Sequence, residues 1–319
     1  MPKTELHVHL EGTLERDLLV RLAERNGVDV PIPEGGFTDL TSFLARYYPA
    51  MQALVTEEDF FDLAWAYLRK AASQSVVHAE LFFDPQAHTG RGVPFPTVIG
   101  GYRRAVLRAE RELGVHADLI LCVLRDLTAQ HAMSTLMEAL PYKAWIVGVG
   151  LDSDERGNPP AKFAAVFARA RAEGFLLTMH CDIDQPGSID NIRAALLDIE
   201  VDRIDHGTNV IEDPALVDVV RERGIGLTCC PISNGFVTDD MKAVEIAALL
   251  RSGVKVRVSS DDPAYFGGYV SENLLALAMA ADLSRDELVQ LQRNALEVSW
   301  LAPFRRDELL ADLEAYAAL

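Results

Sequence analysis

The segment TELHVHL, residues 4–10, is a short run of alternating side chains near the start of the chain. In a β-strand successive side chains point to opposite faces, so His7 and His9 face one side while Val8 and Leu10 face the other. Two imidazoles on one face are well spaced to bind one cation, although a histidine on a strand is more often an ordinary buried polar residue. The segment therefore predicts a strand with two candidate metal ligands.

Seven further short runs of apolar and β-branched residues follow this strand. They lie at 76–83, 117–124, 145–151, 175–181, 201–207, 225–230 and 254–260. Segments with helical periodicity separate most of them, at 96–114, 160–174, 188–199, 213–224 and 241–253. This alternation predicts an α/β fold, a parallel (β/α)8 TIM barrel. An open doubly wound sheet with a smaller second domain is the alternative, because alternation alone does not show that the sheet closes.

The domain organisation follows from the same periodicity. A length of 319 residues would suggest two domains, but no linker rich in proline, glycine or serine divides the chain. We therefore expect one metal-dependent hydrolase domain over residues 1–319. The segment 11–75, between the first two strands, is mostly helical and too long for one crossover, so we expect it to form a helical cap over the barrel mouth. Two or three extra helices should follow residue 271.

The composition excludes several classes of partner. Thirty basic and 48 acidic residues give a net charge of −18, which disfavours nucleic acids and anionic membranes because both attract positive charge. The start of the sequence does not resemble a signal peptide, and no run of 18 apolar residues occurs. Four cysteines are too few for a disulfide framework in a chain of this size. We expect a cytoplasmic protein that binds a small molecule.

Four more polar residues stand at the ends of later predicted strands. His180 ends the fifth strand, His206 ends the sixth, and Asp261 and Asp262 follow the eighth. Barrel enzymes gather their chemistry at the carboxyl ends of the strands. Three imidazoles and one carboxylate with an open coordination position are typical of a catalytic zinc or a similar divalent ion. The joint set predicts one metal ion per chain, with zinc favoured and iron or manganese as alternatives.

Five motifs occur in a characteristic order along the chain. They are ELHVHLEGT at 5–13, GLDSDE at 150–155, RIDHG at 203–207, CPISN at 230–234 and SSDDPAYFGGY at 259–269. On these motifs the chain resembles the adenosine/adenine deaminase family of metal-dependent amidohydrolase barrels over essentially its whole length. The stretch FFDPQAHTGRG at 82–92, together with GLDSDE and DDPAYFGGY, is more similar to the adenine-acting branch.

The resemblance implies a metal centre with defined roles. His7, His9, His180 and Asp261 match the family's metal ligands. His206 matches the histidine that orients the attacking water and helps to deprotonate it. A metal ion in such a site lowers the pKa of water toward 7, which supplies a nucleophile at neutral pH.

The resemblance also implies how a purine ring binds. Asp262 matches the carboxyl that hydrogen-bonds the purine N7, and Ser153 corresponds to the small residue that contacts N3. Glu11 falls where the adenosine-acting members place an acid that contacts the ribose. The implied reaction is hydrolytic deamination of a 6-aminopurine, with adenine converted to hypoxanthine and ammonia.

One loop departs from the family pattern. The family reads His-Ala-Gly-Glu after the third metal histidine, and its glutamate protonates N1 of the purine. This chain has His180-Cys181-Asp182-Ile183-Asp184, with isoleucine at the glutamate position. We predict Asp184 as the replacement acid, with Asp182 as the alternative and a solvent role for both as the third reading. A carboxyl in this role must hold a proton near neutral pH.

Other readings of the sequence remain open. The altered loop is also compatible with a different aminated ring, such as an N6-substituted adenine or adenosine, or with a purine-binding protein of impaired catalysis. His78-Ala79-Glu80 matches half of the cytidine deaminase signature, but the Pro-Cys-x-x-Cys half is missing, so we interpret the match as chance. No phosphate-binding or dinucleotide motif is present, so no nucleotide cofactor is expected.

Overall fold

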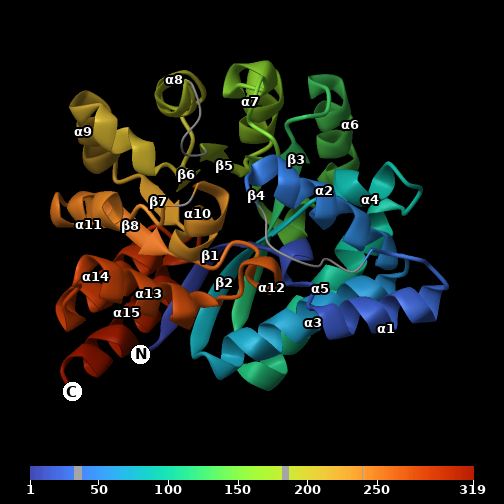
Figure 1. Ribbon diagram of the computed structural model, residues 1–319, viewed down its shortest axis with the longest axis horizontal. Helices are drawn as coiled ribbons and strands as arrows, with labels where there is room; N and C mark the ends of the chain where they lie inside the picture. Colours follow the sequence, from blue (N-terminus) through green and yellow to red (C-terminus); the bar gives the residue numbers. More distant parts are fainter. Residues whose placement is uncertain (32–37, 182–186, 239) are drawn as a thin grey trace.

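The computed structural model describes residues 1–31, 38–181, 187–238 and 240–319, and Figure 1 shows their arrangement. Eight parallel strands form one sheet whose spatial order equals their order in the chain. The strands are β1 (Lys3–His9), β2 (Val76–Phe83), β3 (His116–Leu124), β4 (Ile146–Asp152), β5 (Leu176–Cys181), β6 (Arg203–His206), β7 (Gly226–Cys229) and β8 (Lys255–Val258). All eight strands predicted from the sequence are therefore present.

The sheet closes on itself just beyond β8. The backbone N–H of Asp261 donates to the carbonyl oxygen of His7 (3.0 Å), and the N–H of His9 donates to the carbonyl oxygen of Asp261 (3.1 Å). Val8 and Asp261 form the corresponding parallel bridge. The hydroxyl of Ser259 accepts the backbone N–H of His7 at 3.1 Å. These contacts join the first strand to the last, so the TIM barrel is confirmed and the open-sheet alternative is wrong.

Helices cover the outside of the barrel (Figure 1). Those that follow the strands are α4 (Pro85–Thr89), α5 (Phe95–Leu113), α6 (Ala129–Ala139), α7 (Ala164–Ala172), α8 (Ser188–Arg193), α9 (Pro214–Arg223), α10 (Pro231–Thr238), α11 (Ala243–Arg251) and α12 (Pro263–Phe266). The C-terminal part forms α13 (Val270–Ala281), α14 (Arg285–Glu297) and α15 (Pro303–Ala317), beside the N-terminus. None of the described helices is both long and apolar enough to cross a membrane.

The segment between β1 and β2 supplies two different layers. It contains α1 (Arg16–Asn26), α2 (Leu40–Ala50) and α3 (Glu57–Ser73). Helix α3 packs along α5 on the outside of the barrel. Helix α2 lines the cavity at the mouth with Phe43, Tyr47 and Tyr48 among its side chains. Within this segment, α2 is therefore the helix that contributes to the site.

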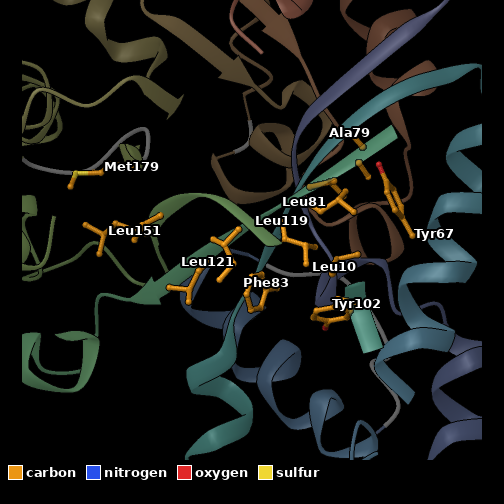
Figure 2. Packing of buried hydrophobic residues seen from close by; sticks show 14 of the residues in the cluster. Leu10, Tyr67, Ala79, Leu81, Phe83, Tyr102, Leu119, Leu121, Leu151 and Met179 are labelled. Atoms are coloured by element: carbon orange, nitrogen blue, oxygen red, sulfur yellow. The ribbon is translucent and has the colours of Figure 1, made fainter. Parts of the chain in front are cut away.

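The main apolar core lies between the sheet and its surrounding helices. Leu81 and Phe83 of β2 and Leu121 of β3 face outward, where they pack near Tyr67 of α3 and Tyr102 of α5 (Figure 2). The alternate residues of the same strands point into the barrel and form a second, smaller cluster. This two-sided burial explains why the sequence of each strand is apolar almost throughout.

The barrel interior is charged at the end opposite the cavity. Glu80 pairs there with Arg203, whose guanidinium lies 4.1 Å from the centre of the Trp300 ring. Burial acts to raise the pKa of Glu80, but the charge of Arg203 outweighs it and lowers the pKa to about 2. His78 bonds to the same carboxylate at 3.2 Å. The His-x-Glu pair noted in the sequence thus lies in this interior network, away from the mouth.

The close contact of α3 with α5 generates a stability prediction. A Cβ added at Gly101 would press on the backbone oxygen of Glu57 and lie 2.7 Å from Cβ of Phe60. We expect Gly101→Ala to lower the free energy of unfolding by about 1–3 kcal/mol in chemical denaturation. Gly100→Ala is the matched control, because its nearest neighbour is the flexible end of the Glu57 side chain at 3.2 Å. Equal stability of the two variants would contradict the packing argument.

Candidate active site

Four potential ligand atoms converge at the carboxyl end of the barrel. Nε2 of His180 lies 3.1 Å from Nε2 of His7 and 3.1 Å from Nε2 of His9. Oδ1 of Asp261 lies 3.3 Å from Nε2 of His7 and 3.6 Å from Nε2 of His9. All four atoms fall within 4.8 Å of one another, and all four residues are buried. The structure thus brings together the ligand set that the resemblance implied.

Hydrogen bonds on the far side of the rings fix where their protons lie. Nδ1 of His180 is 3.0 Å from the carbonyl oxygen of Leu151, which can only accept, so this nitrogen carries the proton. Nδ1 of His7 is 2.7 Å from the hydroxyl of Thr228, which itself donates to Asp205 at 2.9 Å. The Thr228 oxygen therefore accepts from His7. In both neutral rings Nε2 is left with a free lone pair.

Burial favours the uncharged form of the three imidazoles. It lowers the pKa of His7 to about 4, and it also lowers the pKa of His9. The pKa of His180 lies well below its ordinary value because of burial and because of the neighbouring rings of His7 and His9. Lone pairs and a carboxylate at this spacing repel one another unless a cation lies between them. The donor set fits one divalent ion with nitrogen and oxygen ligands.

His206 and Ser233 complete the surroundings of Asp261. Nε2 of His206 lies 3.7 Å from Oδ2 of Asp261, and the Ser233 hydroxyl donates to the same oxygen at 2.6 Å. His206 lines the cavity beside the ligand cluster, and its Nδ1 has no hydrogen-bond partner in the described part of the chain. An imidazole in this place can exchange a proton with a water molecule next to the cluster.

Three site residues have a left-handed backbone. The φ angles are 71° at Ser153, 57° at His206 and 63° at Asp261. Residues with a Cβ rarely adopt this conformation, which costs on the order of 1–3 kcal/mol per residue and is common at functional sites. All three stand where a strand turns into a loop, and the sharp turn directs their side chains toward the cavity.

The cavity above the cluster has a volume of about 570 Å³, within the usual range for small-molecule sites. Asp262 lies in its wall, where burial and the neighbouring charge of Asp261 raise the Asp262 pKa well above its ordinary value. A carboxyl that holds its proton can donate a hydrogen bond. A side chain at Gly12 would overlap Oδ1 of Asp262, so the position of the Asp262 carboxyl requires glycine at residue 12.

Ser153 lines the cavity on the opposite side of the barrel, after β4. The hydroxyl of Tyr48 donates to its Oγ at 2.8 Å, which ties α2 to the end of β4. The structure therefore places both substrate-contacting residues implied by the sequence in the wall of one cavity. Asp182 and Asp184, the predicted acids, lie outside the described residues.

Glu11 does not line the cavity. Its Oε1 accepts hydrogen bonds from Tyr102 (2.9 Å) and from the backbone N–H of Asp84 (3.3 Å), and it lies 2.9 Å from Nε2 of His88. The side chain is fully buried. The acid that could have contacted a ribose is therefore enclosed among protein groups, where it supports the loop that follows β2.

Sequence reasoning missed four residues of the site. Ser233 and Asp205 stood inside the CPISN and RIDHG motifs, and Asp205 shares the inward face of its strand with Arg203. Asp84 directly follows β2 and Asp152 is the last residue of β4, so both carry the same signal as the residues that were found, a polar side chain at a strand end. They form a hydrogen-bonded carboxyl pair in the cavity wall.

The fold and the site define a metal-dependent hydrolase of the (β/α)8 type. The adenosine deaminase family model matches residues 2–316 of the chain. The protein therefore belongs to the adenosine deaminase family.

Two further comparisons locate the chain within that family, and a third concerns the metal. An adenine deaminase of Rhodospirillum rubrum is 48% identical, covering 99% of this chain and 96% of its own. The crystal structure of an adenine deaminase from Arthrobacter aurescens has a TM-score of 0.95 at 39% identity, covering 100% of this chain and 99% of its own. An amidohydrolase from Burkholderia ambifaria solved with bound zinc has a TM-score of 0.88 at 26% identity, covering 99% and 90%.

The lowered pKa values predict how metal binding depends on pH. A histidine whose pKa is lowered stays neutral, and so able to bind a metal, to a lower pH than usual. We expect the zinc affinity of metal-free protein to fall less than about threefold from pH 7.0 to pH 5.5, measured by chelator competition. Three imidazoles of ordinary pKa would lose affinity on the order of 500-fold over this interval. A steep loss between pH 7 and 6 would contradict the predicted burial effect.

Proposed function

We propose that this protein hydrolyses the exocyclic C6–N bond of adenine and releases hypoxanthine and ammonia. The observation that carries the proposal is the convergence of three histidine Nε2 atoms and Asp261 at the floor of a cavity that also presents His206, Asp262 and Ser153. Relatives at 39–48% identity over the full chain that are named adenine deaminases support the choice of substrate.

The metal is the first element of the proposal. His7, His9, His180 and Asp261 would hold one divalent ion, which we propose to be zinc because two or three imidazoles with a carboxylate are ordinary zinc ligands. When bound, the ion lowers the pKa of water and so makes a nucleophile available at neutral pH. The zinc found in the related amidohydrolase supports the same choice.

The protein groups provide orientation and proton transfer. His206 would orient the attacking water and accept its proton, a role supported by the position of its ring beside both the cavity and Asp261. Asp262 would bind N7 of the purine and Ser153 would face N3, so the ring lies across the mouth between β8 and β4. Fixing the ring at two opposite edges holds C6 above the floor of the cavity.

Addition of water to C6 requires a proton on N1, because the ring gives up its aromaticity in that step. We propose Asp184 as the donor, with Asp182 as the alternative. The proposal rests on the sequence, in which two carboxylates follow His180 where the family has one glutamate.

The substrate choice generates a direct test. We expect the zinc-loaded protein to release ammonia from adenine with a kcat/KM at least about 100-fold above that for adenosine, since Glu11 is enclosed and does not face the cavity. N6-methyladenine tests the alternative of a substituted ring, through release of methylamine. If no aminated purine is hydrolysed while purine still raises the melting temperature, the protein is a binding protein and the proposal fails.

The acid assignment has its own test. Asp184→Asn should lower kcat for adenine by about 10²–10⁴-fold, the usual contribution of a general acid, while Asp182→Asn should have a much smaller effect. Zinc content, measured by atomic emission, should stay at one ion per chain in both variants. A reversed pattern would assign the role to Asp182, and two unaffected variants would exclude N1 protonation by either aspartate.

A further inference from the structure

Asp84 is a buried carboxyl in the cavity wall that the proposed reaction does not use. It follows the last residue of β2 and is 2% exposed. One hydrogen bond joins it to Asp152, and its Oδ1 has no partner within the described residues. A buried acceptor without a donor is costly, on the order of 1–3 kcal/mol, so a bound ligand is the natural source of the missing hydrogen.

The order of the strands determines which edge of the purine meets Asp84. Asp262 follows β8 and Ser153 follows β4, and the barrel order from the first to the second is β8, β1, β2, β3, β4. Along the edge of a purine, the atoms between N7 and N3 are C8, N9 and C4, and N9 is the one of them that carries a hydrogen on nitrogen in a free base. The N1 edge lies on the other side of the ring. N9 therefore faces the mouth above β1 to β3, provided that Asp262 and Ser153 bind N7 and N3.

Few described groups are available on that side. Of the described side chains at the ends of β1, β2 and β3, His9 and Asp84 line the cavity. His9 belongs to the proposed ligand cluster, with its Nε2 turned toward His7 and His180. Asp84 is thus the carboxyl that faces the N9 edge, and an oxygen acceptor matches the N9–H of a free base.

Hydrogen bonds on the side away from the cavity fix the position of Asp84. Oε1 of Glu11 accepts the backbone N–H of Asp84 at 3.3 Å, and the same oxygen is bound by Tyr102 at 2.9 Å. The hydroxyl of Tyr47 lies buried in the neighbouring wall from α2. Glu11 and Tyr102 are themselves fully buried, so a movement of the carboxyl away from a substituent on N9 would require these packed side chains to move as well.

We infer that Asp84 reads the N9 position of the substrate, accepting the N9–H of a free 6-aminopurine and rejecting purines that carry a sugar there. This inference rests on the proposed function and deepens it. A substituent on N9 removes the hydrogen, leaves the buried Oδ1 of Asp84 unpaired and adds bulk against it. Sites built to bind a hydrogen-bonding group discriminate strongly against analogues that lack it.

Adenine and 9-methyladenine, compared in the wild type and in Asp84→Ala, form a chemical double-mutant cycle. We expect the wild type to prefer adenine by at least 1,000-fold in kcat/KM. Asp84→Ala should lower kcat/KM for adenine by about 100-fold. The value for 9-methyladenine should stay constant or rise, because the variant removes the side chain that its methyl group meets. Asp84→Asn keeps an acceptor oxygen and nearly the same volume. Its kcat/KM ratio for adenine over 9-methyladenine should be at least tenfold higher than that of Asp84→Ala.

Asp126→Asn is the matched control. Asp126 follows β3, is exposed and stands outside the residues that line the cavity, so its loss removes one nearby negative charge without changing the wall. The ratio of kcat/KM for adenine to kcat/KM for 9-methyladenine should be the same in Asp126→Asn as in the wild type. Zinc content and melting temperature of all variants report whether the fold and the metal centre persist.

Three results would overturn the inference. The first is an equal loss of kcat/KM for adenine and for 9-methyladenine in Asp84→Ala. The second is an unchanged ratio of the two kcat/KM values in that variant. The third is a wild-type protein that deaminates 9-methyladenine as efficiently as adenine. Each of these requires measurable deamination of adenine by the wild type. Absence of that activity would instead refute the proposed function, and the comparison of purine with 9-methylpurine by thermal shift would then decide the role of Asp84 in binding.

Discussion

Three imidazole rings and one carboxylate share a buried space in which their ligand atoms lie within 4.8 Å of one another. His7 and His180 leave Nε2 free in this space because each carries its proton on Nδ1, the nitrogen that points outward. The carbonyl oxygen of Leu151 accepts a hydrogen bond from Nδ1–H of His180, and the hydroxyl of Thr228 accepts one from Nδ1–H of His7 and donates its own hydrogen to Asp205. The surrounding strands therefore act as a frame that fixes tautomers as well as positions. A cation bound among the four groups would remove the repulsion between their lone pairs and the carboxylate.

Much of this molecule could be predicted from local sequence patterns. The alternation of side chains in TELHVHL predicted that His7 and His9 face the same side of their strand. The eight apolar runs predicted eight strands, because buried strands of a parallel sheet are apolar on both faces. Closure of the barrel was harder to predict, since it depends on backbone bonds between His7 and Asp261 that no local pattern reveals. The resemblance to a known family supplied the roles of individual residues, which periodicity alone could not.

The residues that were missed have hydrogen-bond partners that are distant in the chain. The Asp84–Asp152 pair and the Ser233–Asp261 bond form only in the folded barrel, so no local sequence pattern shows them. Glu11 shows the reverse case, because it matched a functional position by sequence but is enclosed by Tyr102 and its neighbours. The loop with Asp182 and Asp184 lies outside the described residues, and its role rests on the sequence alone.

The candidate ligands come from opposite ends of the chain, His7 and His9 from the first strand and Asp261 from just beyond the last. A growing polypeptide therefore holds two ligands from the start of synthesis but cannot complete the metal centre until residue 261 has left the ribosome. Until then β1 has one unpaired edge and the half-built site has no carboxylate. The complete set of candidate ligands is therefore available only after most of the chain has been synthesised.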